Sequence, residues 1–232
     1  MKSVPVESDG GPESWHLPRE RRCGVFEINH PLVDHHLTRM RKATTRPSEF
    51  RDLVRRLAAL MAYEATQDLP TQPYVVQTPL AKSEGVRLEG RIGLVPILRA
   101  GLGMVDPVLD LLPMAEVWHL GLYRDESTAQ PVHYYDKLPA HRPVDTALVL
   151  DPMLATGGSV MAALAALRDW GAPHVKVLSL IASQPGVDAV AAQYPEAQIY
   201  VCQIDPELND RKYIVPGLGD AGDRIFHTLD PE

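Results

Sequence analysis

The chain carries, at residues 146–170, the stretch TALVLDPMLATGGSVMAALAALRDW. Residues 147–150 are a short apolar run typical of a buried strand, and residues 158–170 repeat apolar side chains at helical spacing. Between them, residues 155–159 read ATGGS, with two adjacent glycines. The stretch therefore predicts a strand, a glycine loop and a helix, in that order.

This order of elements is typical of an anion site. Gly157 and Gly158 let the backbone approach a phosphate closely, and the N-terminus of the following helix offers unpaired N–H groups and a favourable dipole. Thr156 and Ser159 add hydroxyl donors, and no Walker or dinucleotide motif is present. A tight turn that merely needs two glycines explains TGG alone equally well. It does not explain Asp151, which directly follows the strand and can accept hydrogen bonds from the vicinal hydroxyls of a ribose 5′-phosphate.

The same alternation of short apolar runs and helical stretches extends along the chain. Strands are expected at residues 74–78, 92–95, 117–122, 147–150, 175–181 and 198–202, and helices at 49–67, 102–111, 158–170 and 186–194. We expect Ser48 to be the N-cap of the first helix. The pattern predicts an α/β fold with a mainly parallel sheet, in which ligands bind at the carboxyl ends of the strands.

Two segments depart from this alternation. Residues 123–143 are polar and predict a flexible arm or a β-hairpin over the site. Residues 1–20 are polar and rich in Gly and Pro, and we expect them to form a loosely ordered extension before one domain at 21–232.

The amino-acid composition and net charge argue against several classes of function. The 232 residues contain 23 Lys and Arg against 30 Asp and Glu, a formal net charge of −7, which argues against a nucleic-acid-binding surface. No apolar run has the length of a membrane span, and the N-terminus lacks a signal-peptide core. Cys23 and Cys202 have no partner spacing and are expected to be idle thiols. A cytoplasmic location is expected.

The loop DPMLATGGS, residues 151–159, resembles the ribose-phosphate loop of the type I phosphoribosyltransferases, and specifically that of the uracil phosphoribosyltransferases. The strings VPILRAGLGM at 95–104 and YIVPGLGDAGDRIF at 213–226 match the same family over long, distinctive runs. Further similarity lies in HPLVDHHLTRMR, LMAYEATQDLP and KVLSLIASQPGV. The resemblance covers about residues 25 to 229.

The resemblance implies the type I phosphoribosyltransferase fold, with helices flanking a central mainly parallel sheet, a β-hairpin arm and a small C-terminal hood. It implies transfer of the phosphoribosyl group from 5-phospho-α-D-ribose 1-diphosphate (PRPP) to uracil, giving UMP and diphosphate. Most of the wider family has two acidic residues at the start of the loop, whereas here Asp151 precedes Pro152. We therefore expect Mg²⁺ to be bound mainly through the diphosphate of PRPP rather than by protein side chains. A homo-oligomer and GTP as an effector are further implications.

The resemblance also assigns the PRPP site. Arg99, beside small residues at a strand end, can offer bidentate hydrogen bonds to a diphosphate, although such an arginine alone is commonly a surface residue. Arg124 begins an Arg-Asp-Glu run that in isolation indicates a solvated loop, and the resemblance places it over the diphosphate. Arg99, Arg124, Asp151 and Asp220 are the expected catalytic residues. The remaining PRPP contacts are Pro152, Met153, Leu154, Ala155, Thr156, Gly157, Gly158 and Ser159.

The uracil site is assigned to the glycine loop near the C-terminus. Ile214, Gly219 and Ala221 are expected to contact the base, and Asp220 to lie between base and ribose phosphate. Backbone groups can match the acceptor–donor–acceptor edge of uracil, and cytosine would leave an unpaired buried donor at a cost of about 1–3 kcal/mol. Residues 211–212 read Arg-Lys where relatives commonly have His-Gly, which leaves the closing motion of the hood open.

Two other interpretations stay open from the residues alone. One is an enzyme of the same fold that acts on a purine, and the other is a regulator that senses PRPP or a nucleotide and binds RNA. The residues identify no general base for uracil N1. They also leave open the oligomeric state, regulation by GTP or UMP, and the role of the N-terminal segment.

Overall fold

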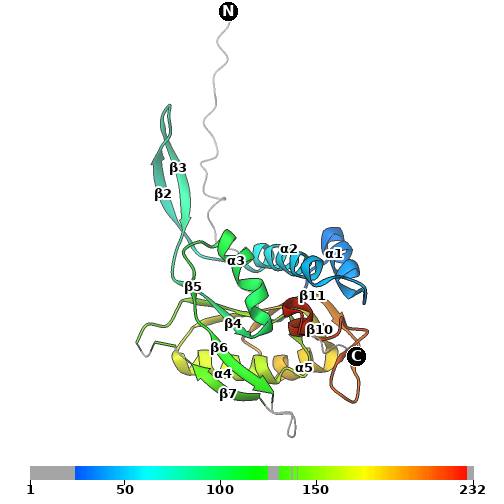
Figure 1. Cartoon of the computed structure of the whole chain (residues 1–232). Coiled ribbons are helices and arrows are strands. Elements are labelled where there is room, and N and C mark those ends of the chain that lie inside the picture. Colours follow the sequence, from blue (N-terminus) through cyan, green and yellow to red (C-terminus); the bar gives the residue numbers. More distant parts are fainter. Residues whose placement is uncertain (1–23, 125–130, 137, 140, 229–232) are drawn as a thin grey trace, which may run out of the picture. The chain divides into compact units, whose positions relative to one another are not determined.

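The computed structural model describes residues 24–124, 131–136, 138, 139 and 141–228 (Figure 1). The chain divides into two compact units, one containing Gln67–Gly90 and the other Arg22–Thr66 with Arg91–Glu232. The predicted extension at 1–20 lies outside the described residues, and the single domain expected at 21–232 stays a prediction.

The larger unit is built on one mostly parallel sheet. Within the described residues its order is β1-β11-β10-β8-β4-β6-β7, with β5 beside β4 and β9 beside β10. The strands are β1 Gly24–Glu27, β4 Ile92–Leu98, β5 Glu116–Val117, β6 Leu120–Arg124, β7 Pro131–Asp136, β8 Thr146–Leu150, β9 Met153–Leu154, β10 His174–Ser183 and β11 Gln198–Asp205. Of these pairings, β6 with β7 is antiparallel and the others are parallel. The mainly parallel α/β sheet is thus confirmed.

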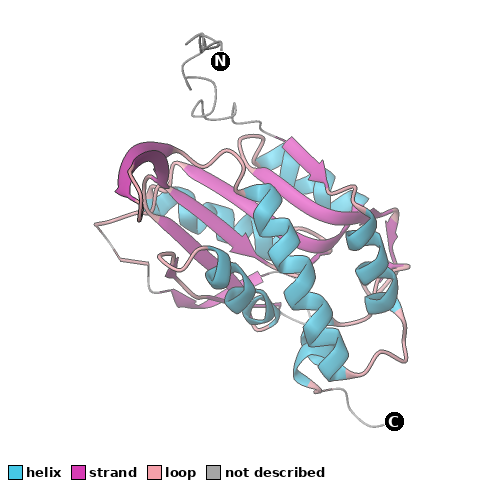
Figure 2. Cartoon of the chain, turned by 90° about the horizontal axis from the view of Figure 1, so that it is seen from above, coloured by secondary structure: helices cyan, strands magenta, loops and turns pink. Residues whose placement is uncertain are grey.

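Helices cover both faces of this sheet (Figures 1 and 2). One face carries α1 Pro31–Arg41, α2 Pro47–Ala65 and α3 Val105–Leu111, and the other carries α4 Gly158–Trp170 and α5 Gln184–Gln193. The five residues of β8 are all buried between these layers, as expected for a strand covered on both sides. A short 3₁₀ turn, η2 Ala100–Met104, precedes α3, and α6 Ala221–Phe226 packs on α2.

Most predicted elements lie where their patterns placed them, because those patterns are local. The helix expected at 158–170 has those bounds, and the strand expected at 147–150 begins one residue earlier. The strand expected at 117–122 is divided into β5 and β6. Ser48 is not an N-cap: α2 begins one residue before it, at Pro47, and the cap position is Arg46, which makes no side-chain capping hydrogen bond.

The strand expected at 74–78 belongs to the smaller unit and not to the central sheet. It is β2 Thr71–Gln77, which pairs antiparallel with β3 Lys82–Leu88 along its whole length. A short apolar run predicts a strand whether that strand pairs in a hairpin or in a central sheet. The sequence pattern therefore could not predict which partner this strand has.

Two further hairpins belong to the larger unit. Strands β6 and β7 form the arm, which confirms the β-hairpin alternative for that segment, while residues 125–130 lie outside the described part. The hood, residues 207–215, consists of β12 Glu207–Leu208 and β13 Ile214–Val215. Lys212 in its turn has a φ of 62°, where glycine is favoured.

No helix among the described residues is long and apolar enough to cross a bilayer.

Candidate active site

Four parallel strands end at one edge of the sheet, and two predicted site residues, Arg99 and Asp151, directly follow two of these strands. Arg99 follows β4 and Asp151 follows β8, while Ser183 ends β10 and Asp205 ends β11. The register aligns Pro96 of β4 with Leu150 of β8, and Ser183 with Asp205. The strand ends therefore bring residues that are far apart in the sequence to the same edge.

The glycine loop leaves the N-terminus of α4 open. Gly157 is the N-cap residue with a φ of 81°, and no side chain caps the helix. A Cβ at Gly157 would lie 2.8 Å from Cγ2 of Val190, so another residue would not fit without movement. The first intrahelical bond runs from the Met161 N–H to the Gly157 carbonyl, 2.8 Å. The N–H groups of the first helical turn remain available to an anion.

A brace behind this loop was missed by the sequence analysis. Ser183 Oγ donates to the carbonyl oxygen of Ala155 at 2.6 Å and accepts from the Gly186 N–H at 3.0 Å. The Cα of Gly186 lies so close to the loop that a Cβ there would be 2.0 Å from the Ala155 oxygen. A serine followed two residues later by proline is a recognisable helix start, which could have identified the cap on α5 but not its contact with Ala155.

Asp151, at the start of the loop, has a carboxyl group whose pKa is well above its ordinary value. Its Oδ1 accepts a hydrogen bond from the Met153 N–H at 3.4 Å. The pKa of Asp151 is raised to about 7, mainly by burial and to a lesser degree by the negative charge of Asp220, while the hydrogen bond from the Met153 N–H opposes this rise. The carboxyl group of Asp151 therefore titrates near neutral pH and is electrostatically coupled to Asp220.

The Arg99 loop packs directly against the Asp151 loop. A Cβ on Gly101 would lie 2.3 Å from the carbonyl oxygen of Leu150, the residue before Asp151, so only glycine permits this approach. The peptide bond between Leu98 and Arg99 is cis.

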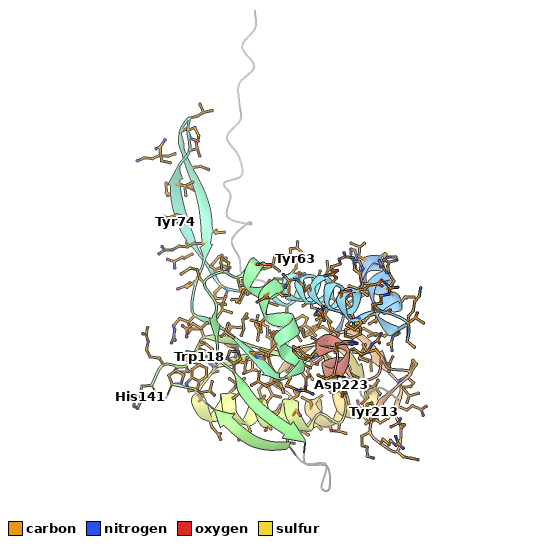
Figure 3. The ribbon with its side chains drawn as sticks, in the orientation of Figure 1. Tyr63, Tyr74, Trp118, His141, Tyr213 and Asp223 are labelled. Carbon is orange, nitrogen blue, oxygen red and sulfur yellow. The ribbon has the colours of Figure 1, made fainter. Side chains whose placement is uncertain are left out.

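The Arg99 loop also contacts the C-terminal loop. The guanidinium Nη2 of Arg99 lies 3.5 Å from Oδ1 of Asp223 on α6, which Figure 3 labels. Asp220 caps the same helix by accepting from the Asp223 N–H at 2.9 Å. The structure thus brings Arg99, Asp151 and Asp220 together.

The predicted base contacts lie on one continuous segment that ends in α6. Ile214 and Ala221 are buried, and Gly219 between them is exposed with a φ of 80°. A Cβ on Gly217 would lie 2.0 Å from the Ile214 oxygen, so the segment turns tightly back on Ile214.

Arg224 fixes this segment from behind and was also missed by the sequence analysis. Its guanidinium donates to the carbonyl oxygens of Leu218, Met40 and Lys42 at 2.7, 2.9 and 2.7 Å. It stacks 4.3 Å from the ring centroid of Phe50, and burial lowers its pKa. Arg224 therefore ties the base segment to α1 and α2.

The other predicted PRPP-binding residues are described in less detail by the structure. Arg124 ends β6, but its side chain lies outside the described part of the structure. Pro152 and Leu154 are buried, while Met153 and the residues Ala155, Thr156, Gly158 and Ser159 are partly exposed along the loop. Within the described residues, no group of three or more His, Cys, Asp or Glu side chains could hold a metal ion.

Comparison with known proteins agrees with this geometry. A family model described as uracil phosphoribosyltransferase matches residues 27–228. A protein of Roseiflexus sp. (strain RS-1) named uracil phosphoribosyltransferase is 60% identical over 204 residues, 88% of this chain and 98% of that protein. One from Symbiobacterium thermophilum with the same name is 53% identical over 205 residues, with the same coverage.

A solved structure has the same fold. The AQ2163 protein from Aquifex aeolicus superposes with a TM-score of 0.84 at 34% identity, covering 89% of this chain and 100% of that one. The family match over nearly all of the described residues and the identity with two named relatives lead to one conclusion: the chain belongs to the uracil phosphoribosyltransferase family.

Proposed function

We propose that the chain transfers the phosphoribosyl group of PRPP to N1 of uracil, forming UMP and diphosphate. The C1–O bond to diphosphate breaks, the C1–N1 bond forms, and the N1 proton is released. The observation that carries the proposal is the convergence of the Arg99, Asp151 and Asp220 loops beside the open N-terminus of α4. Membership of the family supports the choice of uracil over a purine.

The loop after β8 would hold the ribose phosphate. The 5′-phosphate would bind the N–H groups at the start of α4 and the hydroxyls of Thr156 and Ser159. Asp151 would accept hydrogen bonds from the ribose hydroxyls and, when ionised, stabilise positive charge that develops on the ring. Fixing C1 against the base in this way lowers the entropic cost of reaction.

Arginine side chains would stabilise the departing diphosphate. The Arg99 side chain is 62% exposed, and the ion pair that it forms among the described residues is the long 3.5 Å contact to Asp223, so it can turn toward an anion. Arg124 on the arm would add a second charge. Preorganised positive charge is most effective where negative charge accumulates in the transition state.

The base would be read by the segment from Ile214 to Ala221, with Asp220 between base and ribose phosphate. Ile214 and Ala221 supply buried apolar contact, and Gly219 brings the backbone within reach of a flat ring. A cytosine amino group would face a backbone donor and lose about 1–3 kcal/mol of binding free energy.

The residues present fit a magnesium ion that arrives on PRPP. Mg²⁺ is usually held by one or two carboxylates together with substrate phosphates. Asp151 is the first candidate, because an adjacent cation offsets the burial that raises its pKa, and Asp220 is its charged neighbour. When bound, Mg²⁺ would supply positive charge that neutralises the diphosphate.

The activity is tested with radiolabelled uracil, PRPP and Mg²⁺, following UMP by chromatography. We expect UMP that disappears when either substrate is omitted or when EDTA is added, and no nucleotide from cytosine, adenine or hypoxanthine. Nucleotide formed from a purine but not from uracil would contradict the proposal. If no base reacts and the folded protein retains RNA on a filter at low salt, the regulator interpretation replaces it.

A homo-oligomer is proposed as well. The β2–β3 hairpin leaves six apolar side chains at least 41% exposed, namely Tyr74, Val75, Val76, Leu80, Val86 and Leu88. A two-stranded hairpin is marginally stable in water, and an exposed apolar patch is typical of a protein contact. Light scattering should show a multimer that Val75→Lys converts to a smaller species. An unchanged mass for this variant would exclude the hairpin as the contact.

Regulation by GTP rests on family resemblance alone. It predicts that GTP changes the rate of UMP formation, which the same assay measures. A cytoplasmic location stays a prediction of the sequence analysis.

A further inference from the structure

Arg41 and Asp205 form a buried, bidentate ion pair beside the base segment. Nη1 of Arg41 lies 2.8 Å from Oδ2 of Asp205, and Nη2 lies 2.6 Å from Oδ1. The side chain of Asp205 is 3% exposed and that of Arg41 is 18% exposed. Arg41 is the last residue of α1 and Asp205 is the last of β11, so the pair joins two firm elements.

This pair holds both backbone polar groups of Gly217. Nη1 of Arg41 donates to the Gly217 carbonyl oxygen at 2.7 Å, and the Gly217 N–H donates to Oδ2 of Asp205 at 3.0 Å. Gly217 has a φ of 60° and lies against the carbonyl oxygen of Ile214. The pair therefore sets the position of the turn between Ile214 and Gly219.

The position of the pair distinguishes it from an ordinary stabilising contact. Taking two charges out of water costs free energy that their attraction often does not recover, so a buried pair is weak evidence for stability. Here the ion pair also forms hydrogen bonds with the backbone of a glycine turn, and glycine has the greatest backbone freedom of any residue when it is not held in this way. Among the described residues, neither backbone group of Gly219 has a hydrogen-bonded partner, so both remain available to a base.

We propose that Arg41 and Asp205 are positioning residues for uracil: they clamp Gly217 so that the backbone of Gly219 meets the base edge in a fixed geometry. The inference rests on the proposed function. It assigns a role in base binding to two residues that do not themselves touch the substrate, and it predicts that PRPP binding does not depend on them.

The test compares steady-state kinetics of wild type, Arg41→Lys and Asp205→Asn. Asp205→Asn keeps an acceptor for Gly217 but loses the charge, and Arg41→Lys keeps the charge but loses the fork that reaches Asp205 and Gly217 together. We expect the KM for uracil to rise about tenfold or more, because a small misplacement of a positioning group is costly. The KM for PRPP should stay within about twofold, because the phosphate loop is braced separately by Ser183.

Two matched controls use neighbouring contacts. Arg39 lies on α1, as Arg41 does, and Arg39→Gln removes an exposed ion pair between Arg39 and Glu49 of α2. Gln203→Ala removes only the 3.2 Å bond from Nη2 of Arg41 and leaves both bonds to Gly217. Both should keep the KM for uracil within about twofold of wild type.

The outcomes separate the inference from its premise. If wild type forms no UMP, the proposed function fails, and with it the basis of the inference. If wild type is active but both variants lose only thermal stability, or raise both KM values equally, the pair is merely structural and the inference is overturned. Should Asp205→Asn not fold, Arg41→Lys, which retains the buried charge, decides on the same criteria.

Discussion

Arg99 and Asp223 form an ion pair that links the two ends of the candidate site, with Nη2 of Arg99 3.5 Å from Oδ1 of Asp223. Arg99 follows β4, and Asp223 lies in the first turn of α6, the helix that starts at Ala221 and is capped by Asp220. The residue proposed to bind diphosphate is thus in contact with the helix that is proposed to border the base.

Replacing Arg99 should affect catalysis far more than folding. We expect Arg99→Ala to lower kcat about 10²- to 10³-fold, since a preorganised charge on the leaving group is lost. The midpoint of thermal unfolding should change little, because an exposed ion pair contributes at most about 1 kcal/mol. Steady-state rates and a thermal scan check both parts.

The matched control is Arg55→Ala, which removes exposed contacts of 3.4 and 3.7 Å to Asp106 and Asp110. It should leave kcat unchanged. Near-normal turnover of a folded Arg99→Ala enzyme would contradict the role given to Arg99.

Asp151→Asn should stabilise the free protein increasingly as the pH rises. The pKa of Asp151 is about 7 in the folded chain against an ordinary value of 3.8, so the folded state binds its proton more tightly. Stability then falls as pH rises from about 4 to about 7, and the full penalty is present above pH 7. The gain in the unfolding midpoint from Asn should be larger at pH 8 than at pH 5, while UMP binding weakens.

Calorimetry and thermal scans at the two pH values measure these effects. Asp169→Asn, at a side chain that is 74% exposed, is the control and should show no such trend. A gain that is equal at pH 5 and pH 8 would mean that Asp151 is not a buried charge.

Ser183→Ala should weaken PRPP binding and the fold together. The change removes the N-cap of α5 and the bond to Ala155, so we expect a loss of about 1–2 kcal/mol in unfolding free energy and a higher KM for PRPP. Chemical denaturation and kinetics measure the two effects. Ser48→Ala is the control and should cost almost nothing, because Ser48 makes no capping bond. A normal KM for PRPP in Ser183→Ala would show that the phosphate loop does not need the brace.

Gly101→Ala should damage the site through the backbone alone. Its Cβ would lie 2.3 Å from the Leu150 oxygen, so the Arg99 and Asp151 loops must separate, at about 1–3 kcal/mol and with loss of activity. Gly85→Ala is the control, because its Cβ would lie 3.6 Å from the nearest atom, the Tyr74 oxygen. Denaturant titration and the UMP assay compare them, and an active, stable Gly101→Ala protein would contradict the close approach.

The sequence determined those parts of the protein that depend on near neighbours along the chain. The bounds of α4 and the order of strand, glycine loop and helix follow from side-chain periodicity and from adjacent glycines, which act within a few residues. The same local pattern did not predict that β2 pairs with β3 outside the central sheet. It also did not predict that residues 117–122 divide into β5 and β6.

Tertiary structure alone decided which distant groups meet. Arg41 and Asp205 are 164 residues apart in the chain, and Ser183 and Ala155 are 28 apart. The packing of α1 on β11 brings the first pair within hydrogen-bonding distance, and the parallel register of β9 with β10 brings the second. The pKa of Asp151 likewise depends on burial and on Asp220, which no local spacing encodes. Periodicity records which side of an element is apolar, whereas contacts between elements depend on how the whole chain packs.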